Sequence, residues 1–124
     1  MVNNSGTSAL ISGGTQGLGM AVAECLIRQS CTRLTITGRN ADRGEAAAAQ
    51  LREAGADCLF VACDAADTAD CEAAVAAAIG HHGHVNALVN SAADTSRGSL
   101  TNTTAELFDR HIAINVRGPF FMMQ

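Results

Sequence analysis

Short apolar segments alternate with longer amphipathic or alanine-rich stretches along the whole chain. Runs of apolar and β-branched residues predict strands, and they occupy residues 8–11, 33–37, 58–62 and 86–90. Stretches with apolar residues at helical spacing, or rich in Ala, Glu, Gln and Arg, predict helices. They occupy residues 17–30, 41–54, 68–79 and the segment from 104 toward the last residue.

A few residues mark where the predicted helices begin and end. Asp67 or Thr68 is suited to cap the N-terminus of the third helix, and Gly55 is suited to cap the C-terminus of the second. Gly80 is expected to stop the third helix. Pro119 lies inside the last helix and is expected to disturb it locally, because proline has no amide hydrogen to donate.

The repeated alternation of strand and helix predicts the fold class. It indicates right-handed crossover connections and a parallel sheet with helices on both faces. The predicted fold is therefore α/β, a doubly wound, Rossmann-type sheet that is incomplete, with strands in the order 3-2-1-4. Residues 1–124 are expected to form one partial dinucleotide-binding domain, with a ligand crevice at the C-terminal ends of the first and fourth strands.

Composition and charge exclude several classes of function. The chain has 124 residues and 48% of them are hydrophobic, so a single domain with a buried core is expected. The net charge is −4 and the eight basic residues are scattered arginines, which argues against nucleic acid as a partner. No apolar run approaches the ~18 residues of a membrane span, and the N-terminus lacks the pattern of a signal peptide. We therefore expect a cytoplasmic protein without a membrane partner.

Cysteines and histidines do not predict a metal site or a disulfide framework. The five cysteines form an odd number without a C-x-x-C pair, so buried free thiols in a reducing cytoplasm are expected. His81, His82 and His84 are close in sequence, but neighbours in a loop between a helix and a strand rarely converge on one ion. We expect them to be solvated loop side chains, and we predict no metal site.

Residues 12–19, with the sequence SGGTQGLG, join the first strand to the first helix. A turn this rich in glycine lets the backbone adopt positive φ and approach a ligand closely. The helix that follows directs free N–H groups and the positive end of its dipole at the turn, which suits a phosphate. The spacing is G-x-x-x-G-x-G rather than the G-x-G-x-x-G of the standard dinucleotide fingerprint. A tight turn without a ligand is the alternative.

Three further motifs follow the glycine segment in register with the predicted elements. They are Asp64 after the third strand, Asn90-Ser91-Ala92-Ala93 after the fourth, and Asn115-Val116-x-Gly118-Pro119-Phe120 in the last helix. Over residues 9–124 the chain thus resembles the N-terminal half of a short-chain dehydrogenase/reductase. The resemblance implies hydride transfer between a nicotinamide cofactor and a carbonyl or alcohol of a small-molecule substrate. It also implies a homodimer or homotetramer formed through the last helix.

The resemblance implies cofactor contacts from the glycine segment and from the residues that follow the other strands. The implied residues are Ser12, Gly13, Thr15, Gln16, Gly17, Leu18, Gly19, Arg39, Asn40, Cys63, Asp64, Ala65, Asn90 and Ala92. The glycines would line the pyrophosphate, Asp64 would contact the adenine, and Asn90 would pass beside the ribose. A turn-forming or capping carboxylate is the alternative for Asp64.

The end of the second strand bears on the choice between NAD(H) and NADP(H). An acidic residue there, about 20 residues past the glycines, bonds the ribose hydroxyls in NAD-binding folds. Here the sequence is Gly38-Arg39-Asn40, and Arg39 offers a 2′-phosphate a bidentate partner. We therefore favour NADP(H) over NAD(H). A solvated arginine after a strand is the alternative.

The chain departs from the family's pattern near the fourth strand. Ser91 replaces the second Asn of an Asn-Asn-Ala-Gly segment, and Ala93 replaces its glycine. The Ala93 methyl group lies where the backbone is expected to approach the cofactor closely. Asn86 stands where the family usually has Asp. The loop over residues 94–100 is expected to border the substrate side.

Asn115 matches the asparagine of the family's Asn-Ser-Tyr-Lys catalytic set. The resemblance implies that it shapes its helix and holds a water in a proton relay; a polar residue on an apolar helix is the alternative. The Tyr and Lys of that set have no counterpart, because the chain contains neither residue type. The 124 residues alone are therefore not expected to catalyse hydride transfer. A non-catalytic dinucleotide-binding or association module and a truncated remnant are the alternatives.

Apolar side chains crowd the last predicted helix, which in the family packs against later elements. They are Ile112, Ile114, Val116, Phe120, Phe121, Met122 and Met123. With the fourth strand at the edge of the sheet, they are expected to form an exposed patch that promotes association. We expect the isolated chain to be marginally stable and prone to aggregation.

Overall fold

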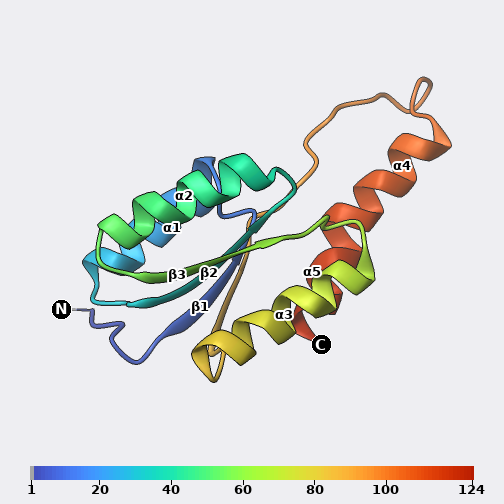
Figure 1. Cartoon of the computed structure of the whole chain (residues 1–124). Helices are drawn as coiled ribbons and strands as arrows, with labels where there is room; N and C mark the ends of the chain where they lie inside the picture. Colours follow the sequence, from blue (N-terminus) through green and yellow to red (C-terminus); the bar gives the residue numbers. More distant parts are fainter. Residues whose placement is uncertain (1) are drawn as a thin grey trace.

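The computed structural model describes residues 2–124 and has a parallel sheet at its centre (Figure 1). Within those residues the sheet has four strands, β1 (Ser8–Ser12), β2 (Arg33–Gly38), β3 (Asp57–Ala62) and β4 (Ala87–Asn90). Their order is β3-β2-β1-β4, and every neighbouring pair is parallel. The predicted Rossmann-type sheet and its strand order are confirmed.

Helices cover both faces of this sheet (Figure 1). They are α1 (Gly17–Arg28), α2 (Ala41–Glu53), α3 (Thr68–His82), α4 (Ala105–Ile112), the π-helical turn η1 (Ala113–Arg117) and α5 (Gly118–Met123). α1 and α2 lie on one face, and α3 and α5 lie on the other. Across residues 2–124, no helix has the length and apolar character needed to cross a lipid bilayer.

Strand β1 separates two hydrophobic clusters. Ala9 and Ile11 belong to the cluster under α1 and α2, whereas Leu10 belongs to the cluster under α3 and α5. Successive side chains of a strand point to opposite faces of the sheet, so one short buried strand serves both clusters. The helices contribute alanines such as Ala48 and Ala74, which lets their backbones lie close to the sheet.

Glycines with positive φ end α2 and α3. Gly55 (φ 108°) directly follows the last turn of α2, and the predicted C-terminal cap is confirmed. The prediction that Gly80 stops the third helix is wrong, because α3 continues to His82 and Gly83 (φ 86°) ends it. A helix interior tolerates glycine at a cost of about 1 kcal/mol. Gly80 therefore remains helical, and the glycine that can adopt the left-handed conformation ends the helix.

The longer α3 changes the position of two histidines. His81 and His82 lie in its last turn and not in a loop. The prediction of a solvated side chain is wrong for His82, whose side chain is 1% exposed because the extra helical turn carries its ring against the carbonyl group of Leu34. His84 follows the helix and is exposed, as predicted.

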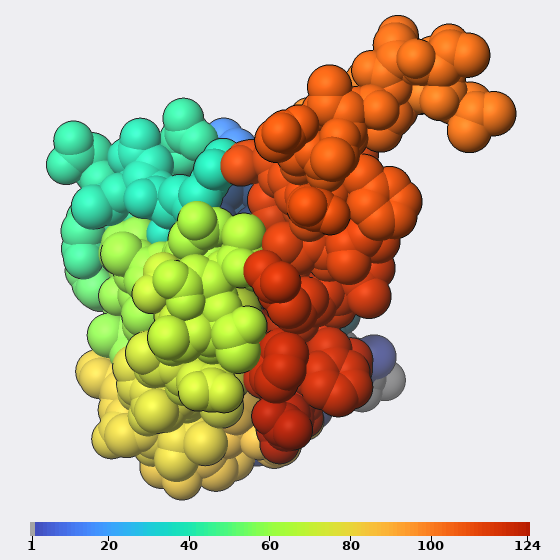
Figure 2. Space-filling view, turned by 90° about the vertical axis from the view of Figure 1, so that its right-hand side faces the viewer, coloured from blue at the N-terminus to red at the C-terminus, as the bar shows by residue number. Residues whose placement is uncertain are grey.

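The segment predicted as one last helix is interrupted. α4 begins after Thr104, whose hydroxyl group accepts a hydrogen bond from the Leu107 amide at 3.1 Å. In η1 the Gly118 amide donates to the carbonyl group of Ala113, and Pro119 occupies the first turn of α5. Proline at that position needs no acceptor, so the expected local disturbance is confirmed as a π-helical turn. The loop before α4 projects from the body of the molecule (Figure 2).

Candidate functional site

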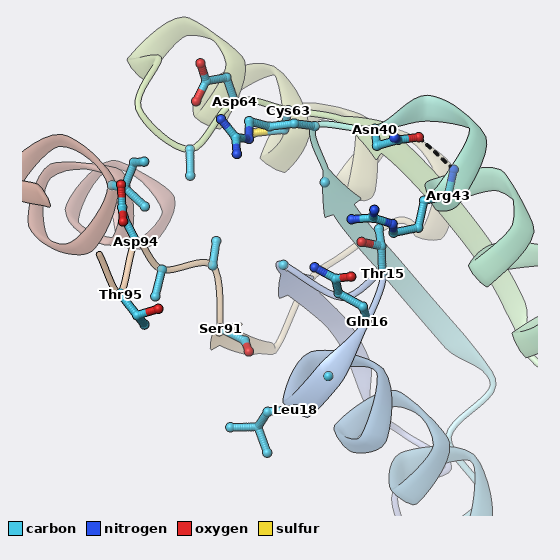
Figure 3. A pocket seen from close by; sticks show the side chains of 18 of the residues that line it. Thr15, Gln16, Leu18, Asn40, Arg43, Cys63, Asp64, Ser91, Asp94 and Thr95 are labelled. Atoms are coloured by element: carbon cyan, nitrogen blue, oxygen red, sulfur yellow. Dashed lines mark hydrogen bonds between the residues drawn. The ribbon is translucent and has the colours of Figure 1, made fainter. Parts of the chain in front are cut away.

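A cavity of about 1000 Å³ opens at the C-terminal ends of the strands. It lies between the first turns of α1 and α2 and the loop after β4 (Figure 3). Each strand delivers a lining residue just beyond its end: Gly13 after β1, Arg39 after β2, Cys63 after β3 and Ser91 after β4. This is the edge at which the sequence predicted a ligand crevice.

Most of the predicted cofactor residues line this cavity. They are Gly13, Thr15, Gln16, Gly17, Leu18, Arg39, Asn40, Cys63, Asp64, Ala65 and Ala92. Ser12, Gly19, Asn90 and Asn115, all within the described range, lie outside the lining. Their contact with a cofactor and that of the lining residues stay predictions.

Ser12 and Asn90 form the floor of the site through the backbone. They are opposite each other in the register of β1 and β4, and the carbonyl group of Ser12 accepts a hydrogen bond from the Ser91 amide at 2.9 Å. Gly19 lies under the glycine turn, where a Cβ atom would collide with the carbonyl oxygen of Gly13. These residues therefore fix the shape of the cavity from behind.

The glycine turn has the conformation that its sequence requires. Gly13 has a φ of 74°, and a Cβ atom there would lie 2.6 Å from the backbone nitrogen of Ala92. Gly17 also has positive φ, 56°, but a Cβ atom there would meet no described atom within 4 Å. Gly13 thus lets two backbone segments pack together, whereas Gly17 faces the open cavity.

The N-terminus of α1 is suited to an anion. Gln16 precedes the helix in extended conformation, and within the described residues its side chain makes no capping hydrogen bond and the first turn carries no acid. The first amides of a helix have no acceptor within the helix. The amides of Gly17 and Leu18 are therefore available to a phosphate at the positive end of the helix dipole.

Two arginines line the end of the cavity near α2. Arg39 follows β2, and Arg43 lies in the first turn of α2. Asn40 caps this helix, because its Oδ1 accepts a hydrogen bond from the Arg43 amide at 2.9 Å (Figure 3). Sequence analysis missed Arg43, although a basic residue in the first turn of the predicted helix, close after Arg39, was a usable signal.

Asp64 combines a structural position with a place in the cavity lining. Its Oδ1 accepts a hydrogen bond from the Ala66 amide at 2.9 Å, and its own amide donates to Asp70 Oδ2 at 2.9 Å. The turn-forming alternative is therefore present in the structure, and the adenine contact stays a prediction. Asp67, and not Thr68, caps α3, since its carboxylate accepts from the helix's first amides.

Asn115 holds the loop after β4. Its Oδ1 accepts from the Asp94 amide and its Nδ2 donates to the Asp94 carbonyl oxygen, each at 2.9 Å. The Asp94 carboxylate in turn binds Ser96 and Arg110, whose Nε lies 2.6 Å from Oδ2. Hydrogen bonds from Ser96 and then from Arg110 hold the pKa of Asp94 well below its ordinary value.

This cluster forms part of the cavity wall after β4. Asp94, Ser96 and Arg110 line it, whereas Leu100 is fully exposed away from it. The start of this loop therefore lines the cavity, and the expectation that residues 94–100 border the substrate side stays a prediction. Sequence analysis missed Arg110, because the pairing of a loop with a helix 16 residues later leaves no local pattern.

The Cys63 thiol lines the cavity in its protonated form. Burial raises the pKa of Cys63 to about 12. A thiol with such a pKa is a poor nucleophile at neutral pH. Cys63 therefore offers the cavity a small, neutral surface and not a reactive group.

Asn86 has a clear structural role before β4. Its Oδ1 accepts a hydrogen bond from the Ser8 amide at 2.8 Å, and its Nδ2 donates to the Gly6 carbonyl oxygen at 3.0 Å. An ionised Asp could accept but not donate. Asn86 thus joins the start of β4 to the start of β1 with both halves of its amide.

A comparison with known families identifies this arrangement. Residues 7–124 match the model of the short chain dehydrogenase family. The chain belongs to the short-chain dehydrogenase family. The predicted resemblance is confirmed.

Individual relatives agree with this assignment. The chain is 36% identical over 119 residues to a sorbitol dehydrogenase of Cereibacter sphaeroides, covering 96% of this chain and 45% of that protein. It is 34% identical over 117 residues to an NADP-dependent (R)-specific alcohol dehydrogenase of Lentilactobacillus kefiri, with coverages of 94% and 45%. A blue fluorescent protein from a metagenomic library, solved in complex with NADPH, superimposes with a TM-score of 0.92 at 31% identity, with coverages of 98% and 50%. The chain thus spans about half the length of these relatives.

Proposed function

We propose that this short-chain dehydrogenase chain is the NADP(H)-binding part of an oxidoreductase that transfers hydride between the nicotinamide and a carbonyl or alcohol substrate. The observation that carries the proposal is the position of Arg39 and Arg43 at one end of a cavity whose centre is the glycine turn. The NADP-dependent alcohol dehydrogenase and the NADPH complex among the similar proteins support the same cofactor.

The residues of the cavity fit such a cofactor. Gly17 leaves room for a pyrophosphate beside the turn, and the first amides of α1 would donate to its oxygens. The guanidinium groups of Arg39 and Arg43 would hold a 2′-phosphate by charge-assisted hydrogen bonds. The bound nicotinamide would supply the hydride, and Asp64 and the start of the loop after β4 would orient the rest of the cofactor.

We further propose that these 124 residues bind the cofactor without catalysing hydride transfer. The reaction needs a group that can give or take a proton at the substrate oxygen. The chain contains no Tyr and no Lys. The Asp94 carboxylate is held ionised by Ser96 and Arg110, and the Cys63 thiol is held protonated, so neither supplies that group near neutral pH.

A non-catalytic association module is the second candidate, and one observation favours it. Phe108, Ile112, Val116 and Phe120 are exposed and recur every four residues from α4 to α5. The last helical segments, coloured orange-red to red, form part of the molecular surface in Figure 2. A second copy of the chain could bury it, which is consistent with the homodimer or homotetramer expected from the family.

We also propose that the protein acts in the cytoplasm, where thiols stay reduced. The five cysteines are free, and Cys31, Cys58, Cys63 and Cys71 are buried. Free buried thiols suit a reducing compartment and contribute to packing as small apolar groups.

Titration with NADPH and NADH, followed by nicotinamide fluorescence, tests the proposed function. We expect saturable binding of both, with NADPH bound at least about tenfold more tightly, because charge-assisted hydrogen bonds contribute about 1.5–3 kcal/mol each. Equal affinity would remove the preference for NADP(H). Absence of binding by either, with the chain folded by circular dichroism, would favour the association module.

A further inference from the structure

Asp57, His81 and His82 come together at the edge of the sheet opposite the cavity. Asp57 is the first residue of β3, whereas the cavity lies beyond the last residues of the strands. His81 and His82 come from the last turn of α3. One possible ligand atom from each of the three side chains lies within 4.8 Å of the others.

His82 is the fixed member of this group. Its side chain is 1% exposed, and its Nε2 lies 3.0 Å from the Leu34 carbonyl oxygen. A carbonyl oxygen can only accept, so Nε2 carries the hydrogen and Nδ1 of the neutral ring carries a lone pair. Nδ1 lies 3.9 Å from Asp57 Oδ2, which is too long for a hydrogen bond. The buried ring thus points an unused lone pair toward a carboxylate.

This arrangement is typical of a histidine that binds a metal. Such histidines commonly donate their other ring N–H to a backbone carbonyl group or a carboxylate, which fixes the ring and its tautomer. In His82 the Leu34 carbonyl group has that position. The orienting contact is therefore already present in the folded chain.

Asp57 and His81 complete the group from the solvent side. His81 Nε2 lies 2.9 Å from Asp57 Oδ1, and the rings of His81 and His82 are 4.6 Å apart. Asp57 Oδ1 thus accepts a hydrogen bond from His81, while Asp57 Oδ2 lies on the side of His82. The three side chains also lie at the C-terminal end of α3, where the helix dipole favours a cation.

We propose that Asp57, His81 and His82 bind a zinc ion that joins the end of α3 to the start of β3. Two imidazoles and one carboxylate form a donor set suited to Zn²⁺, whereas Mg²⁺ and Ca²⁺ prefer oxygen ligands. Water would complete the tetrahedral coordination. This site is separate from the proposed cofactor cavity and does not depend on it.

The ion can be accepted after small side-chain movements, with the proton on His81 Nε2 moving to Nδ1 or to solvent so that Nε2 offers a lone pair. Donor atoms of a tetrahedral zinc site with bonds of ~2.0 Å lie about 3.3 Å apart. The side chains of Asp57 and His81 are 63% and 41% exposed, so both can rotate toward the buried His82. The sequence prediction of no metal site assumed that His81 and His82 lie in a loop. The helical turn that contains them removes that objection.

Zinc titration of the chelator-treated 124-residue chain tests the proposal. We expect a single-site calorimetric isotherm and a rise in Tm with Zn²⁺ but not with Mg²⁺, since an ion that binds only the folded state stabilises it. Asp57→Asn and His81→Ala change exposed side chains, and each is expected to weaken zinc binding at least about tenfold. His84→Ala and Glu72→Gln are matched controls that should bind zinc as the parent chain does.

Two outcomes would overturn the proposal. The first is zinc affinity that is unchanged in both Asp57→Asn and His81→Ala, provided that their metal-free melting curves match that of the parent chain. The second is a thiolate-to-cobalt charge-transfer band when Co²⁺ replaces Zn²⁺, because that band would assign the ion to cysteines. The cobalt spectrum of an imidazole and carboxylate site lacks it.

Discussion

The side-chain amide of Asn115 is hydrogen-bonded to both polar groups of the Asp94 backbone. Oδ1 accepts from the Asp94 amide and Nδ2 donates to the Asp94 carbonyl oxygen, both at 2.9 Å. One side chain in the π-helical turn η1 thereby fixes the loop that borders the cavity. Within the described residues, Asn115 acts on the site through this loop and does not line the cavity itself.

Replacing Asn115 should release that loop. Asn115→Ala removes two hydrogen bonds and is expected to lower the free energy of unfolding by about 1–3 kcal/mol. Urea unfolding followed by circular dichroism measures this change. His84→Ala, at an exposed position away from η1 and the loop, is the control and should stay within about 0.5 kcal/mol of the parent chain. Equal effects of the two variants would contradict the conclusion that the Asn115 side chain holds the loop at Asp94.

Reversing the charge of Arg39 should remove the preference for NADPH. Arg39→Asp places a carboxylate near the proposed 2′-phosphate and is expected to weaken NADPH binding at least about tenfold, with little loss of NADH affinity. Nicotinamide fluorescence titrations give both constants. Arg97→Asp makes the same charge change in the loop outside the cavity lining and should leave both constants unchanged. If NADPH affinity fell equally in the two variants, a long-range charge effect would replace the proposed contact.

The two glycines of the turn should respond differently to alanine. Gly13→Ala combines positive φ with a Cβ atom 2.6 Å from the Ala92 nitrogen, and is expected to cost about 3 kcal/mol or more of stability. Gly17→Ala has positive φ but open space, so about 1–2 kcal/mol is expected. Gly6→Ala, with neither constraint, is the control. Thermal and urea unfolding rank the three variants, and an equal cost at Gly13 and Gly17 would argue against the backbone contact.

Acid should weaken the fold through Asp94. Its pKa is lowered in the folded chain, so the unfolded chain binds the proton first and stability falls as the pH falls below about 4. The contribution of Asp94 to the free energy of unfolding is fully present above the pKa of an aspartate in the unfolded chain, about 3.9. We expect the stability difference between the parent chain and Asp94→Asn to shrink from pH 5 to pH 2. Asp109→Asn removes a carboxylate from α4 as a control. A difference that stays constant with pH would show that Asp94 contributes without its charge.

The sequence predicted the fold and the centre of the site because both depend on local patterns. The strand order follows from the alternation of strand and helix, and the glycine turn follows from positions such as Gly13 that require positive φ. The predicted end of α3 was wrong because the sequence does not distinguish Gly80 from Gly83. Only Gly83 has the left-handed conformation that ends the helix.

Contacts between distant segments were out of reach of the sequence. Arg110 pairs with Asp94 across a loop, and Asp57 meets His81 from 24 residues away. These pairs depend on how helices lie against the sheet, and small shifts in a helix boundary change them. Only the structure could therefore reveal these two side-chain clusters, one near the C-terminal ends of the strands and one at the N-terminal end of β3.

The division of the interior by β1 has a consequence for ligand binding. One group of side chains joins β1 to α1 and α2, and the other joins it to α3 and α5. A dinucleotide lying across the end of β1 would contact both layers of the molecule: the layer of α1 and α2 on one face of the sheet and the layer of α3 and α5 on the other. Each layer has its own hydrophobic cluster. Binding of the dinucleotide would couple the opening of the two layers, so amides of α3 and of α1 would acquire the same hydrogen-exchange protection. Without it, the two layers would exchange independently, and exchange rates with and without NADPH would measure how strongly the ligand joins them.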